Sequence, residues 1–104
     1  QCSKEVQDWY DRLKSYAMSL GDGVEERVLR EYIAFRHVKN FAYIRFRPTL
    51  NKIYIGLAVL PAHQVGLEGE FVRVRHEKGI EVQIDSIEDV ERTEPLIALS
   101  YRDA

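Results

Sequence analysis

Arginine and aromatic side chains alternate with apolar ones in the segment FAYIRFR, at residues 41–47. In a β-strand, successive side chains point to opposite faces of a sheet, so the apolar members would line a core. The remaining four, Phe41, Tyr43, Arg45 and Arg47, would share the other face. Aromatic rings and guanidinium groups stack on nucleobases while cations pair with phosphates, at roughly 1–3 kcal/mol per stacked base. The same residue types are enriched at the centres of protein interfaces, so the segment predicts a binding surface of one of these two kinds.

The same alternation extends this surface across the neighbouring predicted strands. The candidate binding residues are cations and aromatic residues: Arg36, Phe41, Tyr43, Arg45, Arg47, Lys52, Tyr54, Phe71, Arg73 and Arg75. Tyr32, Glu81 and Gln83 complete this outer face, on which Glu81 is the one acid. The inward face would consist of Ile33, Phe35, Ala42, Ile44, Phe46, Ile53, Ile55, Leu57, Val72, Val74, Ile80, Val82 and Ile84. Because the inward set contains no charged residue, the alternation predicts one buried and one open face.

Three interpretations of the outer face are open. It would dock a partner protein domain, bind nucleic acid or another anionic ligand, or simply be solvated. Exposed antiparallel sheets often carry tyrosine, arginine and lysine because long side chains pair across strands. Arginine over an exposed aromatic ring contributes about 0.5–1 kcal/mol without any ligand. A single β-bulge would turn part of a strand over and disperse the surface.

The elements that must position these residues follow from periodicity and turn signals. Apolar residues recur with helical spacing over residues 4–20, Ser3 can cap this helix, and Gly21 can end it. After a short strand or irregular lead-in from residue 24, strands are predicted at 31–36, 41–47, 52–60, 70–76 and 80–84. A final helix starts after Ser86, and Pro95 is expected to kink or divide it.

This order predicts an α+β fold, with an antiparallel meander of about four or five strands between an N-terminal and a C-terminal helix. Two helices cannot easily cover both faces of such a sheet, so we expect them to pack on one face. The result is a two-layer sandwich whose second face is open. The chain of 104 residues has the size of a single domain, at 1–104.

Composition sets limits on the class of protein. Hydrophobic residues make up 45% and charged residues 31%, and no apolar run reaches the length of about 18 residues that spans a membrane. The single cysteine, Cys2, cannot form an internal disulfide, so the fold does not depend on an oxidising compartment. We therefore expect a cytoplasmic domain without membrane contact. The start at Gln1 predicts a fragment of a longer chain. The net charge of −2 argues against coating nucleic acid through bulk charge, but acids cluster at 22–26 and 85–91, which leaves a local basic patch.

Catalytic and metal-binding patterns are not evident. His37, His63 and His76 are isolated, and the sequence has no Gly-rich phosphate loop and no nucleophile elbow. We therefore predict no catalytic residue, no metal site and no cofactor. One enzymatic alternative is open, because small ribonuclease toxins also combine a helix with an antiparallel sheet. In that case His37 or His76 would act as general acid, and Arg45 or Arg47 would stabilise the transition state.

Several motifs resemble a known domain family. They are LGD before the first strand (residues 20–22), YIAF (32–35), KNFA (39–42), the KIYIGL strand (52–57) and the terminal segment from Ser86. The chain is similar, from about residue 9 onward, to an uncharacterised bacterial domain labelled "predicted transport protein". That domain is often C-terminal in larger proteins, including predicted restriction-type endonucleases. The resemblance implies an accessory domain and supplies no catalytic residues. The chain departs from the family at VRVRHEKG (72–79), where members usually carry a Gly- and Trp-containing stretch.

Together these features predict a non-catalytic accessory domain of a bacterial defence or DNA-processing protein. Its outer face would bind nucleic acid or a partner protein domain.

Overall fold

The computed structural model describes residues 3–104 and confirms the α+β class. Its helices are α1 (Lys4–Met18) and α2 (Ile87–Asp103). Its strands are β1 (Glu25–Val28), β2 (Ile33–Arg36), β3 (Asn40–Arg47), β4 (Lys52–Leu57), β5 (Val72–Val74) and β6 (Ile80–Ile84). Cys2, for which the sequence predicts no internal disulfide, lies outside the described residues.

The sheet has six strands rather than the four or five predicted from the sequence. The additional strand is β1, in the segment where the sequence left a short strand or an irregular lead-in open. It pairs antiparallel with β2 and places Glu26 opposite Phe35. Its sequence, EERV, is almost entirely exposed and shows no apolar alternation. A strand of this kind forms because its backbone pairs with a neighbour, and periodicity alone does not reveal it.

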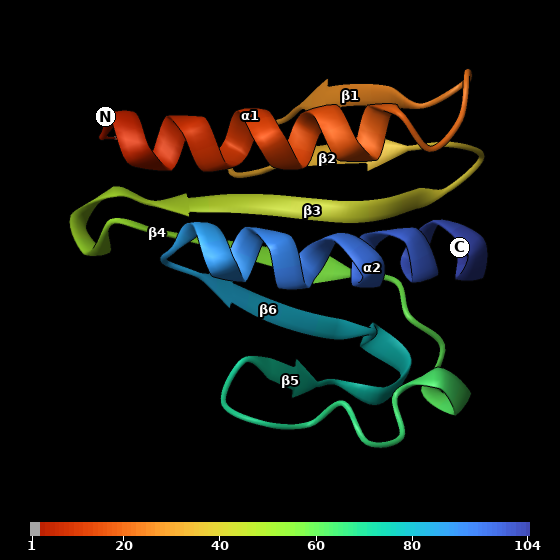
Figure 1. Ribbon diagram of the computed structural model, residues 1–104. Coiled ribbons are helices and arrows are strands. Elements are labelled where there is room, and N and C mark those ends of the chain that lie inside the picture. Colours follow the sequence, from red (N-terminus) through yellow and green to blue (C-terminus); the bar gives the residue numbers. More distant parts are fainter. Residues whose placement is uncertain (1–2) are drawn as a thin grey trace.

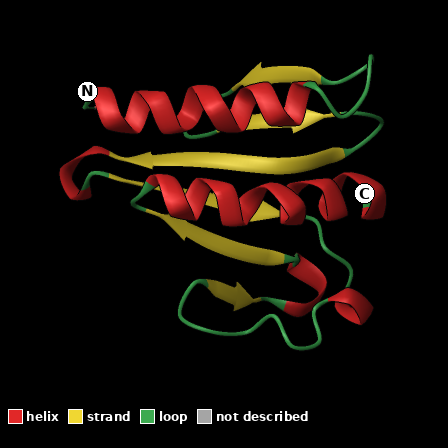
Figure 2. Ribbon diagram, viewed as in Figure 1, coloured by secondary structure: helices red, strands yellow, loops and turns green. Residues whose placement is uncertain are grey.

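All strand pairs are antiparallel, but their order departs from a simple meander. The order across the sheet is β1-β2-β3-β4-β6-β5. The long connection after β4 carries the chain past the position of β6 to the outer edge (Figure 2). The chain then returns through the predicted hairpin, in which Gly79 has a φ of 85°. A side chain at residue 79 would collide with the carbonyl oxygen of Leu57, so the turn requires glycine.

The two helices lie side by side on the same side of the sheet (Figure 1). This arrangement confirms the expectation that they pack together on one face. The opposite side of the sheet carries no helix from the described part of the chain. We call this uncovered side the open face.

The helix side of the sheet forms the hydrophobic core. Ile44, Ile53, Ile55 and Ile84 are at most 1% exposed, as expected from their inward alternation. From α1, the core receives Val6, Trp9, Tyr10, Leu13 and Ala17, and from α2, Val90 and Ile97. Burial of each large apolar side chain contributes about 1.5–3 kcal/mol, so this layer holds both helices on the sheet.

Local signals set the ends of the helices. The Ser3 hydroxyl accepts a hydrogen bond from the Val6 N–H at the start of α1, and Ser86 caps α2 in the same way. Pro95 does not divide α2, which continues to Asp103. Pro95 is on the exposed side of the helix, while buried residues on the other side hold the helix on the sheet.

Candidate nucleic-acid interface

Strand register gathers most of the predicted binding residues on the open face, from β3 to the edge strand β5. Arg45 lies opposite Tyr54, and Arg47 lies opposite Lys52, across the β3–β4 pair. On the other side of β4, Gln83 of β6 lies opposite Tyr54. The members of this group that the sequence predicted are Tyr43, Arg45, Arg47, Lys52, Tyr54, Arg73 and Arg75. Arg73 joins it as the cross-strand partner of Glu81, and Arg75 joins it through an ion pair with Glu81.

Phe41 does not belong to this surface, and the prediction for it is wrong. The register shifts here, because Phe35 pairs with Ala42 whereas Arg36 pairs with Asn40. Phe41 is therefore the extra residue of a β-bulge, and its side chain turns to the helix side. There it is 0% exposed and packs edge-on against the ring of Tyr101 at 5.2 Å.

Two other predicted residues lie at the margins of the open face. Arg36 is exposed at the end of β2, opposite Glu25, and borders a separate hollow beside His37. Phe71 is half-buried at the β5 edge, where the Arg92 guanidinium stacks 4.0 Å from its ring centre. Neither residue is part of the central group.

Charge on the open face is mainly positive, and one acid moderates it. Oε2 of Glu81 is 3.3 Å from Nη2 of Arg45 and 3.8 Å from Nη1 of Arg75. Lys52 donates a 2.8 Å hydrogen bond to Gln83, and the Arg47 guanidinium lies 5.4 Å from the Tyr54 ring centre. Within residues 3–104, the structure gives Arg47, Lys52 and Arg73 no carboxylate partner.

Most cations of the two helices are held in ion pairs instead. Arg12 bridges Glu91 and Glu94 of α2, at 3.5 Å and 3.1 Å. Glu26 accepts hydrogen bonds from the hydroxyl of Tyr10 and from Lys14 on α1. These two bonds, that of Tyr10 first, hold the pKa of Glu26 below its usual value. The two sides of the domain therefore differ: three cations of the open face lack a carboxylate partner, whereas most helix cations are in ion pairs.

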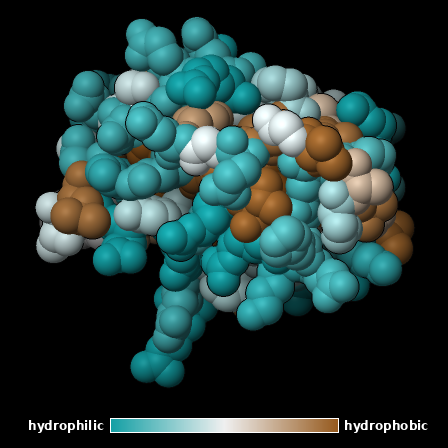
Figure 3. Space-filling view, turned by 90° about the horizontal axis from the view of Figure 1, so that it is seen from below, coloured by the Kyte–Doolittle hydropathy of each residue, from teal (hydrophilic) through white to brown (hydrophobic). Residues whose placement is uncertain are grey.

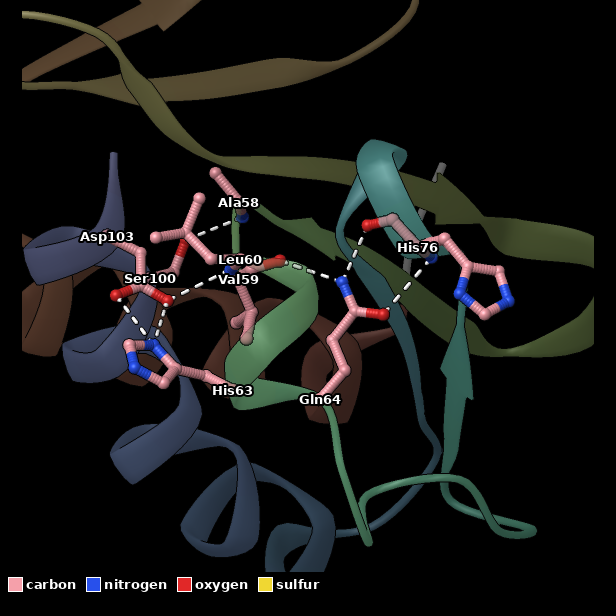
Figure 4. Close-up of polar contacts among 8 residues, drawn as sticks. All are labelled: Ala58, Val59, Leu60, His63, Gln64, His76, Ser100 and Asp103. Carbon is pink, nitrogen blue, oxygen red and sulfur yellow. Dashed lines mark hydrogen bonds and ion pairs between the residues drawn. The ribbon is translucent and has the colours of Figure 1, made fainter.

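His37 and His76, the candidate general acids of the ribonuclease alternative, lie in different environments. The His37 ring packs 5.2 Å from the Tyr101 ring of α2. His76 has a φ of 56°, and the buried Gln64 side chain holds its backbone by bonding both its N–H and its C=O. In Figure 4 the His76 ring points away from Gln64. No hydrogen bond between either imidazole and an arginine is found in residues 3–104.

A histidine–carboxylate pair that the sequence did not reveal lies nearby (Figure 4). Nδ1 of His63 is 2.9 Å from Oδ2 of Asp103, and the Leu60 N–H donates to the same oxygen. Burial alone would raise the pKa of Asp103, but the bonds from His63 and Leu60 outweigh it, so this pKa is lowered. The residues are forty positions apart in the chain, and only the packing of α2 brings them together.

This pair is not part of a nucleophilic triad. The Ser100 hydroxyl, also drawn in Figure 4, is buried and accepts a bond from the Ala58 N–H while donating to the Phe41 carbonyl. It therefore fixes the bulge and the end of β4 to α2, and it makes no bond to His63.

In residues 3–104, no group of three His, Cys, Asp or Glu residues could hold a metal ion. The described helices also include none with the length and apolar character needed to cross a membrane.

Comparison with models of protein families gives a match over the whole chain. A family model described as "Domain of unknown function (DUF5655)" covers residues 1–104. No curated protein and no solved structure matches the chain. The matching description mentions neither transport nor restriction endonucleases, so those associations stay predictions.

Proposed function

The chain belongs to the DUF5655 family of domains of unknown function, so its function must be inferred from its own structure, and we propose that its open face binds single-stranded nucleic acid. The observation that carries the proposal is the grouping of Arg45, Arg47, Arg73 and two tyrosines on one helix-free side of the sheet. Cations paired with stackable rings on an open sheet are the elements of single-strand recognition. A role as a non-catalytic accessory domain of a DNA-processing or defence protein is part of this proposal.

The spacing of the cations supports an extended strand as the ligand. Arg45 and Arg47 are two residues apart on one face, which separates their Cα atoms by about 6.8 Å. Arg73 continues the row of cations two strands beyond β4. Unpaired bases of a single strand can turn toward Tyr43 and Tyr54 while its phosphates meet the guanidinium groups.

Docking of a hydrophobic partner has weaker support. The large hydrophobic residues with the highest exposure are Val28, Val38 and Val65, and they lie on three different connections or strand ends. Hydrophilic residues dominate the space-filling view from below, with the hydrophobic ones in a few groups (Figure 3). Arginine and aromatic residues are enriched at interface centres, but the most exposed large hydrophobic residues do not gather into the continuous apolar patch on which a hydrophobic partner docks.

Salt dependence of binding tests the proposal. We expect a fluorescently labelled 12-nucleotide single strand, as DNA and as RNA, to bind with an anisotropy change at 50 mM salt. If three or four phosphates are neutralised, the slope of log K against log salt is about −2 to −3, a loss of roughly 20- to 50-fold between 50 and 200 mM. Absence of binding to either strand at 50 mM salt would refute the proposal and leave docking of a partner protein or a solvated face.

Paired variants localise the contact. The double variant Arg47→Gln, Arg73→Gln removes two open-face cations that lack carboxylate partners, and we expect its salt slope to fall by about 1.4. The matched control is Lys4→Gln, Arg12→Gln, which removes the same charge from the helix side. An equal loss in both variants would mean that binding depends only on total charge and not on this face.

A further inference from the structure

Gly56 occupies the centre of the open face, where a glycine is not required for the fold. It is an inner residue of β4, between Tyr43 of β3 and Glu81 of β6. Its φ is not in the left-handed region, and a Cβ built there would meet only Tyr43 atoms, at an ordinary 3.9 Å. Glycine inside a strand lowers stability relative to alanine by about 0.5–1 kcal/mol. The missing side chain therefore needs another explanation.

The absence of a side chain leaves a hollow in the sheet surface. Tyr32, Tyr43 and Tyr54 supply its aromatic walls, with the rings of Tyr32 and Tyr43 edge-to-face at 5.4 Å. The hollow has a volume of about 390 Å³ and is open to solvent, so a flat ligand can enter it from above. A planar ring can therefore lie above Gly56 in contact with tyrosine side chains.

Glu81 gives this hollow a directional polar wall. Arg45 and Arg75 both approach Oε2 of Glu81, which holds the carboxylate in place beside Gly56. Oε1 has no hydrogen-bond partner among residues 3–104, and Oε2 accepts a single hydrogen bond, from Arg45, so both oxygens can accept a further one. A carboxylate only accepts hydrogen bonds, so the hollow offers an acceptor to a ligand that carries N–H donors.

We propose that this hollow holds one unstacked guanine of a bound single strand. Guanine is the base whose Watson–Crick edge presents two adjacent donors, N1–H and the N2 amino group, to a carboxylate. Cytosine and adenine present an amino donor next to an acceptor, and thymine and uracil present mainly acceptors, which Glu81 would repel. The Arg45 and Arg75 guanidinium groups offset the repulsion between Glu81 and the phosphates of the strand. This inference rests on the proposed function and adds base preference to it.

A structural explanation of Gly56 competes with this inference. An aromatic residue opposite a strand glycine can cover its exposed backbone, and Tyr43 is the direct cross-strand partner of Gly56. If that contact is the only reason for glycine, then alanine at this position would not alter base preference.

The test compares labelled nonamers that differ only in the central base. The set is T9 and T9 with its fifth base replaced by G, A or C, with the corresponding U9 set in RNA to distinguish the two nucleic acids. We expect the wild-type domain to bind the G nonamer roughly 5- to 150-fold more tightly than T9, from the discrimination typical of a bidentate contact. Equal affinity for all four sequences would overturn this inference, whereas absence of binding to all of them would refute the proposed function itself.

Variants then place the preference at the hollow. Gly56→Ala adds a methyl group to its floor, and Glu81→Gln replaces one acceptor oxygen by a donor, so both should bring the ratio of G to T affinity close to one. Glu25→Gln is the matched control, because it removes an acid from β1 beside a different hollow and should keep the ratio. The melting temperature of Gly56→Ala should equal or exceed that of the wild type. A retained preference in Gly56→Ala, or a fall in its melting temperature together with a loss of all binding, would overturn the inference.

Discussion

Replacing Ser100 by alanine tests the contact that sets the geometry of β3. The Ser100 side chain is 0% exposed, and its hydroxyl lies 2.6 Å from the Ala58 nitrogen and 2.5 Å from the Phe41 oxygen. Ser100→Ala leaves these two backbone groups without that partner, the Phe41 oxygen in a buried bond and the Ala58 nitrogen in a partly buried one. Each loss costs about 1–3 kcal/mol. Alanine is the better helix former by about 0.5 kcal/mol, which offsets part of the loss.

We therefore expect the free energy of unfolding to fall by about 3 kcal/mol, within an interval of about 1.5–5.5 kcal/mol. For a domain of this size, such a loss lowers the melting temperature by about 12–24 °C. The measurement is urea denaturation followed by circular dichroism, with the slope of unfolding free energy against urea checked for constancy.

Thr93→Val on the same helix is the matched control. Thr93 is also 0% exposed, but its hydroxyl bonds the Asp89 carbonyl within α2. That carbonyl is already part of the helical ladder, so Thr93→Val should change stability by less than about 1 kcal/mol. If Ser100→Ala destabilised the domain no more than Thr93→Val, the argument that Ser100 anchors the bulge would be refuted.

Two further predictions concern the bulge and the charged contacts of β1. Phe41→Ala should lower the free energy of unfolding by about 3–5 kcal/mol in urea titrations, because Phe41 is a core residue. Tyr43 is 37% exposed, so Tyr43→Ala should lower it by only about 1 kcal/mol. Similar losses in the two variants would contradict the bulge. The lowered pKa of Glu26 stabilises the folded state above the ordinary pKa of 4.5, and this contribution is lost as the pH falls through the folded pKa. Denaturant titrations between pH 7 and pH 2 should therefore show a lower free energy of unfolding for Glu26→Gln than for the wild type above pH 4.5. The two free energies should become equal in acid, and a difference that does not change with pH would contradict this reasoning.

Several parts of the fold follow from local pattern. Alternation assigned Ile44, Ile55 and Val82 to the buried face, and all three are at most 1% exposed. Such patterns are readable because every second residue of a strand has the same environment. Ser3 and Ser86 likewise marked helix starts because an N-cap bond spans only three residues.

Other parts of the fold depend on pairing between distant segments. β1 is a strand because its backbone meets β2, and the exchange of β5 and β6 depends on where a long connection returns. The pairing of His63 with Asp103 depends on how α2 crosses the sheet. The local pattern left a short strand or an irregular lead-in open at β1, and it gave no sign of the other two.

The sequence by itself determined that cations and aromatic residues would share one face of the β-layer, because alternation is a property of the extended backbone. Only the tertiary structure decided which of them meet. The bulge removed Phe41 from that face, and cross-strand register joined Arg45, Glu81 and Arg75 around Gly56. The physical reason is that strand register and bulges depend on how all the strands pair with one another and pack on the helices. No single segment of the sequence contains that information.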